Sequence, residues 1–246
     1  VEPDLQCSGI GSAMFESLKE ILNRKGITAL TTQSDWRNLS LLRFLSSRGF
    51  QISPVSVLEW DVNYINTRVN SEVVRENFET EGGEKDFSDS HGDDETALAR
   101  DKVFCRSLNQ NDLLSLVRID KKVTGVNHTV FYQSKMREVL EESGIRVSLV
   151  AEIDGQVFGF IMARVDYGEF GRTEPVAVLD TIAVDPGLGN QQIGSALLSQ
   201  LLANLTSLRL DTVRTVVRAE QFDVSRFLAR NGFQTSQRLS FSYPFE

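Results

Sequence analysis

Glycines stand in front of an amphipathic segment near the start of the chain, in the run Gln6-Cys7-Ser8-Gly9-Ile10-Gly11. This pattern predicts a loop that opens into a helix. The first turn of a helix leaves backbone N–H groups without partners, and the helix dipole adds partial positive charge there. Glycines let the backbone approach a ligand closely, so the run could bind a phosphate. A glycine-capped helix without a ligand explains the same residues equally well.

The same junction occurs twice, because residues 1–53 align without a gap on residues 184–236. About a third of the aligned positions are identical and most others keep their polarity, which indicates that one fold is repeated. The glycine pattern is complete in the first copy. In the second copy, Gly194 stands at the position of Gly11. Gln192 takes the place of Gly9, and Gly189 takes the place of Gln6.

Composition divides the chain into three parts. Residues 63–101 carry nearly all of the net charge of −8, and the tract Glu79–Glu95 within them has few apolar residues and no periodicity, so we expect an acidic linker there. An acidic segment could also attract a basic partner. The linker separates residues 1–62 from residues 102–246, and a chain of 246 residues has room for one complete domain and a further part.

Residues 102–246 contain the signals of a complete α/β domain. The pair Asp154-Gly155 between two apolar runs predicts a β-hairpin, and the β-branched run Val176–Val184 predicts a central strand. Around them we expect strands at Val103–Arg106, Val147–Ile153, Val157–Val165, Val213–Arg218 and Leu239–Tyr243, and helices after Asp112 and at Val130–Ser143, Ile193–Leu205 and Asp223–Asn231. Residues 1–62 contain only the second half of this order, with a helix through Ile21, a strand Ala29–Gln33, a helix Asn38–Ser47 and a strand Val55–Val62.

This order, with Val-acid-Pro before the glycine loop and Gly-Phe before the last strand, resembles the GNAT superfamily of acyl-CoA-dependent N-acyltransferases. The family signature is Gln/Arg-x-x-Gly-x-Gly/Ala, which Gln6, Gly9 and Gly11 match in full. A shifted alignment of Gln191 to Ala196 would satisfy the signature in the second copy but would break the match on Val-x-Pro. The resemblance implies an α/β GNAT fold, with a mixed, mostly antiparallel central sheet flanked by helices, in one complete and one partial copy.

The resemblance covers nearly all of residues 102–246, whereas residues 1–62 supply only the C-terminal half of the fold. A half sheet with an exposed central edge would be unstable. We therefore expect the missing strands to lie upstream of Val1, or residues 1–62 to pack on other sheet material. The second domain and another copy of the chain are both open as that material, and a homodimer would fit the latter.

In the family, acyl-CoA lies between the central strand and the next one, with its pyrophosphate at the helix start. The resemblance implies acetyl-CoA as the cofactor and places its pantetheine arm along Ile182, Ala183 and Val184. The backbone amides expected to hold the pyrophosphate are those of Gly189, Asn190, Gln191, Gln192, Ile193, Gly194 and Ser195, with Gln6, Gly9 and Gly11 in the first copy.

An amine acceptor has to lose a proton to attack the thioester. Deprotonating a lysine-type amine at pH 7 costs about 4–5 kcal/mol, so a base is useful. Asp180 occupies a strand position that often bears an acid in relatives, and we predict that it is the base, although a structural carboxylate would also explain it. The segment Tyr167–Pro175 is expected to be a loop near the thioester. Its Glu169 or Glu174 is predicted to bind a cationic amine, although charges that face water explain both.

The tyrosine that acts as general acid in many relatives is absent, because Leu45 and Leu228 stand at its place in the two copies. Tyr132 and Tyr243 could substitute for it, although each also fits an ordinary core or surface aromatic residue. The two histidines, His91 and His128, have no metal-ligand spacing and no triad partner, so we expect no metal site.

The sequence therefore predicts an N-acetyltransferase that acts on an amine of a small molecule or peptide, with its active site in residues 102–246. A weak or inactive GNAT-like module for acyl-CoA binding or dimerisation is the alternative, and an interaction protein with an acidic recruiting segment is a third. A basic stripe for nucleic acid is missing. No apolar run approaches the ~20 residues of a membrane span. Cys7 and Cys105 suggest no disulfide framework, so we expect a cytoplasmic protein.

Overall fold

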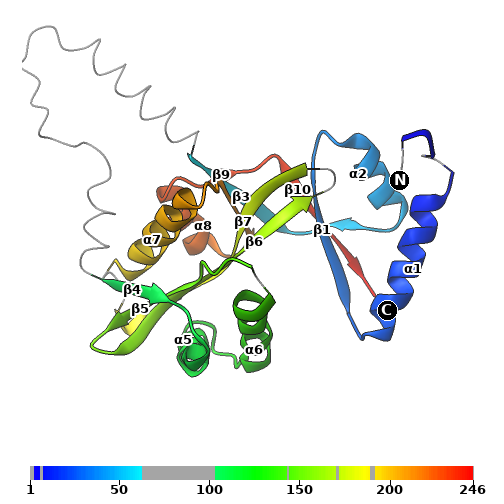
Figure 1. Cartoon of the computed structure of the whole chain (residues 1–246). Helices are drawn as coiled ribbons and strands as arrows, with labels where there is room; N and C mark the ends of the chain where they lie inside the picture. Colours follow the sequence, from blue (N-terminus) through cyan, green and yellow to red (C-terminus); the bar gives the residue numbers. More distant parts are fainter. Residues whose placement is uncertain are drawn as a thin grey trace, which may run out of the picture. The chain divides into compact units, whose positions relative to one another are not determined.

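The computed structural model describes residues 3–5, 8–62, 103–142, 144–169, 172–188 and 192–245. The chain divides into two compact units, each described separately below (Figure 1). Unit 1 consists of residues 1–58, 217–225 and 235–246, and unit 2 of residues 59–216 and 226–234. The predicted acidic linker, residues 63–101, lies outside the described residues.

Unit 2 is built on a mixed sheet with helices on both faces. Its elements are β4 (Phe104–Ser107), η2 (Gln110–Asp112), α5 (Leu113–Thr124), α6 (Thr129–Arg137), a π-helical turn η3 (Glu138–Glu142), β5 (Leu149–Ile153), β6 (Gln156–Glu169), β7 (Arg172–Val184), η4 (Pro186–Leu188), α7 (Ile193–Ser207) and most of β8 (Thr212–Arg218). With β3 (Val55–Asp61) and β9 (Gln234–Thr235), the strands form a sheet in the order β4-β5-β6-β7-β8-β3-β9. The pairs from β4 to β7 are antiparallel and β7 pairs with β8 in parallel, which confirms the predicted fold class.

Local sequence explains how these elements begin and end. A capping box between Asn109 and Asp112 starts the α5 region, and Gly125 in the left-handed conformation ends it. Asp154 (φ 49°) and Gly155 (φ 77°) form the turn between β5 and β6, so the predicted hairpin is confirmed.

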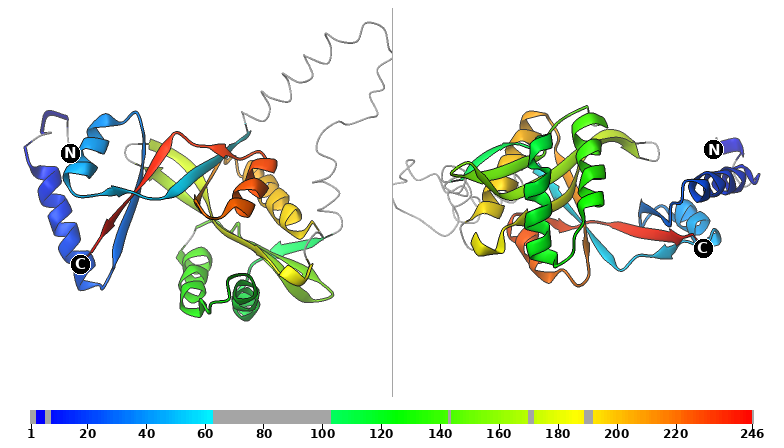
Figure 2. Two further views of the ribbon diagram at one scale, coloured as in Figure 1. Left: turned by 180° about the vertical axis from the view of Figure 1, so that it is seen from behind. Right: turned by 90° about the horizontal axis from the view of Figure 1, so that it is seen from below.

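The helices of unit 2 cover opposite faces of the sheet (Figure 1). Phe160 of β6 belongs to the core under α5 and α6, which lie side by side (Figure 2). The preceding residue, Gly159, points the other way, because a Cβ built on it would meet Ile193 and Leu197 of α7. Successive strand residues face opposite sides, so β6 and β7 are buried between two helical layers.

Unit 1 contains the first copy of the repeat and the last strand of the second. Its elements are η1 (Pro3–Leu5), α1 (Ile10–Arg24), β1 (Ala29–Asp35), α2 (Leu39–Ser47), β2 (Gln51–Ile52), most of β3 and β10 (Arg238–Pro244), while α8 (Phe222–Arg230) begins in unit 1 and ends in unit 2. A small core of Phe15, Leu45, Phe50 and Phe241 holds unit 1 together.

The two copies exchange their last strands. In the repeat, β3 corresponds to β10, yet β10 lies between β1 and β2 of the first copy, and β3 lies between β8 and β9 of the second. The sheet β1-β10-β2 is antiparallel throughout and runs in register from Ala29–Pro244 to Asp35–Arg238. The strand orders β1-β10-β2 and β8-β3-β9 are therefore equivalent, so the repeat in the sequence is also a repeat in the structure.

Hydrogen bonds related by the repeat support this exchange. Ser53 donates to the carbonyl of Ser240, and its counterpart Ser236 donates to that of Val57, each at 2.9 Å. A second pair has the same relation: Val62 donates to the Asp211 carbonyl at 3.0 Å and Phe245 to the Thr28 carbonyl at 3.0 Å. Both copies therefore use the same backbone contacts.

Two expectations about elements were wrong. The segment Tyr167–Pro175 is not a loop: Tyr167 pairs with Pro175 and Glu169 with Arg172, so β6 and β7 form one long ribbon. The polar residues of this segment are typical of a turn, but two strands can pair through backbone hydrogen bonds whatever their side chains are, so the sequence did not reveal the ribbon. The helix expected at Val130–Ser143 changes to π-helical geometry at Glu138. The two-residue strands β2 and β9 are too short to leave a pattern.

Candidate functional site

The central strand β7 and its neighbour β8 separate part of the way along. Their described pairing covers Ala177–Leu179 of β7 and Val213–Thr215 of β8, and the Thr215 hydroxyl also donates to the Leu179 carbonyl at 2.8 Å. Beyond Leu179, β7 continues to Val184 while it stays paired with β6. The edge of β7 that faces β8 therefore offers backbone N–H and C=O groups between the two strands.

A β-bulge marks the point of separation. Met162 of β6 pairs with Thr181 and Ala163 pairs with Leu179, so Asp180 is the extra residue on β7. Bulges redirect side chains and end pairing, and they are frequent beside active sites. The bulge thus puts the predicted base at the first residue of β7 beyond the described pairing with β8, which is the inner end of the separation.

Asp180 lies in a network of ion pairs on the α6 side of the sheet. One carboxylate oxygen, Oδ1, accepts a hydrogen bond from Arg164. The other, Oδ2, lies 3.3 Å from Lys135 Nζ, which has Glu138 as a closer partner at 2.8 Å. Arg164 also contacts Glu138 at 3.3 Å and Asp166 at 3.0 Å. Three carboxylates around two cations leave an excess of one negative charge.

The two oxygens of Asp180 differ in what they can still accept. The side chain is only 13% exposed, and Oδ2 is buried without a hydrogen bond, since the Lys135 contact does not have hydrogen-bond geometry. Burial is the largest single influence on the pKa of Arg164 and lowers it. The hydrogen bond to Asp180 and the negative charges of Asp180, Asp166 and Glu138 together outweigh burial, so the pKa of the guanidinium is raised. Oδ1 is therefore occupied by the Arg164 guanidinium, which is always charged, whereas Oδ2 can accept a hydrogen bond from a further donor.

The helix after β7 begins in a conformation suited to an anion. Gln192 precedes α7 with a left-handed backbone (φ 57°), and no side chain caps the helix start. Its counterpart Gly9 has the same conformation (φ 86°) before α1, also without a side-chain cap. A non-glycine residue in this region is strained by about 1–3 kcal/mol. The loop geometry is therefore kept in the second copy although the glycine is not.

Most of the residues predicted to bind the cofactor, where the structure describes them, lie along β7 and at the start of α7. Ile182, Ala183 and Val184 lie beyond the last pairing with β8, and Gln192 to Ser195 form the start of α7. Gly194 lies beside Phe227 and Val184: a Cβ on it would be in ordinary contact with the Phe227 ring at 3.5 Å and with Val184 at 3.7 Å, and a larger side chain would meet both. Gly189, Asn190, Gln191 and Gln6 lie outside the described residues. Gly9 and Gly11 lie in unit 1, at the start of α1.

One residue that the sequence did not single out positions this junction. Asp185, directly after β7, is buried, and its carboxylate accepts from Lys122 Nζ of α5 at 2.7 Å and from the Gly187 amide at 3.1 Å. Its own amide donates to the Phe158 carbonyl at 2.7 Å. The sequence shows the acid in Val-Asp-Pro, but it does not show that this acid pairs with Lys122, because the two residues are 63 positions apart in the chain.

This contact predicts a pH-dependent stability. The hydrogen bond from Lys122 holds the pKa of Asp185 below its ordinary value of 3.8, although burial acts in the opposite direction. A lowered pKa in the folded state adds stability that is present above about pH 4 and is lost as the pH falls through the folded pKa. In urea titrations, Asp185→Asn should be less stable than wild type at pH 7, and this difference should vanish at strongly acidic pH. A difference that is constant with pH would contradict this.

The two glutamates predicted to bind the acceptor do not lie beside Asp180. Glu174 is exposed on β7, and six residues of strand separate it from Asp180, which is about 20 Å at ~3.3 Å per residue. Glu169 pairs with Arg172 near the end of the ribbon. A role for either glutamate with a cationic acceptor stays a prediction, and it would require an acceptor that reaches along the ribbon.

The aromatic and histidine candidates are packed into cores or paired. Leu45 and Leu228 are buried, and Tyr243 packs against Phe15 and Phe50 in unit 1. Tyr132 is buried in unit 2, where burial and the nearby Asp120 raise the pKa of its hydroxyl far above the ordinary value.

Asp120 contacts both Tyr132 and His128. It accepts a hydrogen bond from the Tyr132 hydroxyl at 3.1 Å and lies 2.7 Å from Nδ1 of His128, while His91 lies outside the described residues. The partner of His128 could not be predicted from the sequence, because the contact with Asp120 depends on the loop between α5 and α6.

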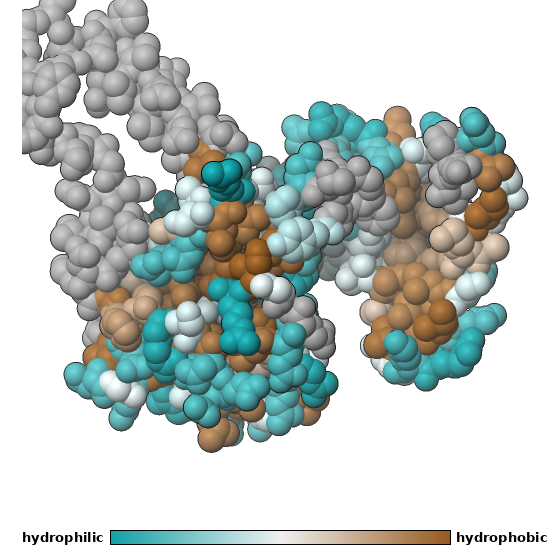
Figure 3. Space-filling model, in the orientation of Figure 1, coloured by the Kyte–Doolittle hydropathy of each residue, from teal (hydrophilic) through white to brown (hydrophobic). Residues whose placement is uncertain are grey.

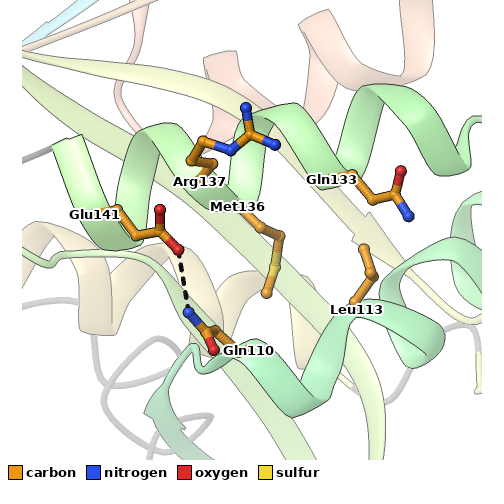
Figure 4. Close-up of a pocket in the computed structure, with 6 residues that line it drawn as sticks. All are labelled: Gln110, Leu113, Gln133, Met136, Arg137 and Glu141. Atoms are coloured by element: carbon orange, nitrogen blue, oxygen red, sulfur yellow. Dashed lines mark hydrogen bonds between the residues drawn. The ribbon is translucent and has the colours of Figure 1, made fainter.

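A groove of about 440 Å³ lies elsewhere in unit 2, between η2, the start of α5 and the end of α6 (Figure 4). It is lined by Gln110, Leu113, Gln133, Met136, Arg137 and Glu141. Gln110 donates to Glu141 at 3.2 Å across it, as the dashed line shows. None of the predicted site residues lines the groove, so we place the candidate site at the strand separation.

Comparisons with known proteins bear on the family and the fold. Residues 113–233 match the model of the acetyltransferase (GNAT) family. Two solved structures are similar over 99% of this chain: a GCN5-related N-acetyltransferase from Sphaerobacter thermophilus (14% identity, 70% of that chain, TM-score 0.53) and a tandem GNAT protein from the clavulanic acid biosynthesis pathway (12% identity, 72% of that chain, TM-score 0.58). At these identities the likeness shows the fold alone.

Two further searches, one for curated relatives and one for membrane-spanning helices, were negative. No curated protein matches this sequence significantly. Among the described residues, no helix has both the length and the apolar composition that crossing a membrane requires.

Proposed function

We propose that this chain, which belongs to the GNAT acetyltransferase family through residues 113–233, transfers an acetyl group from acetyl-CoA to an amine. The observation that carries the proposal is the separation of β7 from β8 at a bulge whose extra residue is Asp180. One feature thus combines an open backbone edge for an extended ligand with a carboxylate at its inner end.

The residues of this junction fit acetyl-CoA. The open edge of β7 at Ile182 and Val184 can pair with the amides of the pantetheine arm as a strand would. The start of α7, without a side-chain cap, can donate backbone N–H groups to the pyrophosphate. We assign this role to the amides from Gly189 to Ser195, and the corresponding role in the first copy to Gln6, Gly9 and Gly11.

Asp180 acts as the base through Oδ2. The incoming ammonium displaces Lys135 from Oδ2, donates a hydrogen bond to it and then transfers a proton to it, directly or through one water. The amine nitrogen attacks the thioester carbonyl, the new C–N bond forms and the C–S bond breaks. The attacking nitrogen still carries one proton more than the amide needs, and it passes this proton through water to the departing thiolate. No tyrosine acid is required, because a thiol with a pKa near 8.5 is a tolerable leaving group.

The excess negative charge around Asp180 favours a cationic acceptor. Glu138, Asp166 and Asp180 surround two cations, and Glu138 and Asp166 are partly open to solvent. A positively charged amine would therefore be attracted to the site before it loses its proton. This charge supports an amine with its own cation and does not choose among small molecules and peptides.

An acyl-CoA-binding module with little turnover is the second candidate. Two observations favour it: Leu228 is buried where relatives carry a tyrosine acid, and Asp180 already faces two cations. Both candidates require acetyl-CoA to bind, and only the first requires free thiol to be released.

Calorimetry and thiol release separate the candidates, and the repeat offers a matched pair of variants. Gly194→Trp fills the start of α7 beside Phe227, and Gly11→Trp makes the same change in the first copy. We expect Gly194→Trp to weaken acetyl-CoA binding to the second copy by at least about 100-fold, equal to ~2.7 kcal/mol, and Gly11→Trp to leave the second copy's binding unchanged. A loss of binding with Gly11→Trp would assign a cofactor site to the first copy as well. Thiol release with a panel of diamines would support the transferase, and binding without any release would support the module.

A further inference from the structure

Lys135 of α6 lies where the proposed mechanism requires the ammonium group of the acceptor. Its Nζ is 3.3 Å from Oδ2 of Asp180, the oxygen that is buried without a hydrogen bond. The other oxygen, Oδ1, is occupied by Arg164. Among the lysines that the structure describes, only Lys135 lies within ion-pair distance of Asp180. The protein therefore carries a primary amine of its own beside the proposed base.

The surroundings of Lys135 differ from those of the nearest lysines in the chain. Hydrophilic residues predominate on the part of α5 and α6 that the space-filling view shows (Figure 3). Lys121 and Lys122, in the last turn of α5, are exposed, whereas the side chain of Lys135 is only 20% exposed. A lysine side chain ordinarily keeps its ammonium group in water. The position of the Lys135 ammonium group is therefore set by its protein partners.

Glu138 is the partner that fixes this position. It stands one helical turn after Lys135 and accepts a hydrogen bond from Nζ at 2.8 Å. Glu138 also contacts Arg164 at 3.3 Å. Asp180 thus has one cation at each carboxylate oxygen, and the two cations differ in chemistry. Arginine stays protonated in proteins, whereas a lysine that gives up a proton becomes a nucleophile.

We propose that Lys135 is itself an acetylation site, and that each chain acetylates its own Lys135 from acetyl-CoA bound between β7 and β8. The proposal rests on the transferase function and on Asp180 as its base. An amine that the fold holds beside the base reacts within one molecule, which favours it over a dilute free amine. Acetylation removes the charge of Lys135, so Glu138, Asp166 and Asp180 then surround Arg164 alone.

The step balances with acetyl-CoA as the only other reactant. Lys135 Nζ gives one proton to Oδ2 of Asp180 and attacks the carbonyl carbon of the thioester. The C–N bond forms and the C–S bond breaks. The nitrogen passes one further proton through water to the departing thiolate. The products are Nζ-acetyl-lysine and free thiol, and Asp180 then returns its proton to water.

The test is peptide mass spectrometry of the full chain after incubation with acetyl-CoA that carries an isotope-labelled acetyl group, without any added amine. We expect label to appear at Lys135 at least about 100-fold faster than at the exposed Lys121, which reports the uncatalysed reaction. Lys135→Arg keeps the positive charge but has no primary amine, so this variant should gain one acetyl group fewer per chain.

Two variants examine whether the site performs the reaction. Asp180→Asn should slow the labelling of Lys135 by about 100-fold and leave Lys121 unchanged, because asparagine cannot take the proton. Asp166→Asn should change the Lys135 rate by no more than about threefold. Calorimetry with acetyl-CoA checks that both variants still bind the cofactor. At saturating acetyl-CoA, the rate constant at Lys135 should not depend on protein concentration, since the reaction stays within one chain.

Three results would overturn the proposal. They are equal labelling rates at Lys135 and Lys121, a Lys135 rate that Asp180→Asn leaves unchanged, and a Lys135 rate constant that rises in proportion to protein concentration. The last would show that another molecule supplies the active site.

Thiol release with an added diamine separates this failure from a failure of the transferase function. Release with the diamine while Lys135 stays unmodified would contradict only the acetylation of Lys135. Bound acetyl-CoA with neither thiol release nor label at Lys135 would contradict both proposals.

Discussion

Asp180→Asn is expected to lower the kcat of acetyl transfer by about 100- to 1,000-fold, the usual contribution of a general base. Asparagine keeps the shape and the hydrogen bond from Arg164 but cannot take a proton from the amine. Acetyl-CoA affinity should stay within about twofold, because the cofactor is held by the backbone of β7 and α7. The measurement is steady-state thiol release with a diamine acceptor, together with calorimetry of acetyl-CoA.

Asp166→Asn is the matched control. Asp166 also binds Arg164, but it lies on β6, is more exposed and is not the bulge residue. Its replacement should change kcat by no more than about threefold, as expected for an exposed ion pair. If Asp180→Asn binds acetyl-CoA normally and retains full turnover, Asp180 is a structural carboxylate and the assignment of the base is wrong.

Ending the chain after Gln237 is expected to unfold the first copy, although the deleted residues belong to the second. The deletion removes β10, the middle strand of the sheet β1-β10-β2, and with it Phe241 of the unit 1 core. Amide exchange measured by mass spectrometry should show protection lost from residues 29–52 and largely kept in residues 149–165. Protection that persists in residues 29–52 would show that β10 is not their partner.

A point substitution gives the same test with less disruption. Phe241→Ala should lower the free energy of unfolding of unit 1 by about 3–5 kcal/mol, the usual cost of removing a buried phenylalanine. Ser242→Ala, in the neighbouring residue of β10, should cost less than about 0.5 kcal/mol. Equal effects of the two variants would contradict the packing described for the unit 1 core.

Local signals in the sequence were sufficient for most elements. The Asp154-Gly155 turn, the β-branched run before Val184 and the apolar spacing after Gly194 each depend on residues close together in the chain. The exchange of last strands could not be predicted in this way. The segments around Arg43 and Arg226 have nearly the same sequence, so local patterns do not say which copy each following strand joins.

The candidate site shows the same division. The sequence indicated the start of α7 through a pattern within a short segment, and the resemblance to the GNAT superfamily indicated Asp180. It missed Lys135, Arg164 and Lys122, whose partners lie on other elements. The bulge at Asp180 was also missed, since it is defined by the register between β6 and β7 and not by residue type.

Hydrogen exchange of the full chain with and without acetyl-CoA tests the central claim most directly. We predict slower exchange at residues 180–184 of β7 and at residues 192–195 of α7, with the remaining strands of unit 2 unchanged. Saturating acetyl-CoA that leaves both segments unaffected, or that protects only residues elsewhere in the chain, would contradict the placement of the cofactor between β7 and β8.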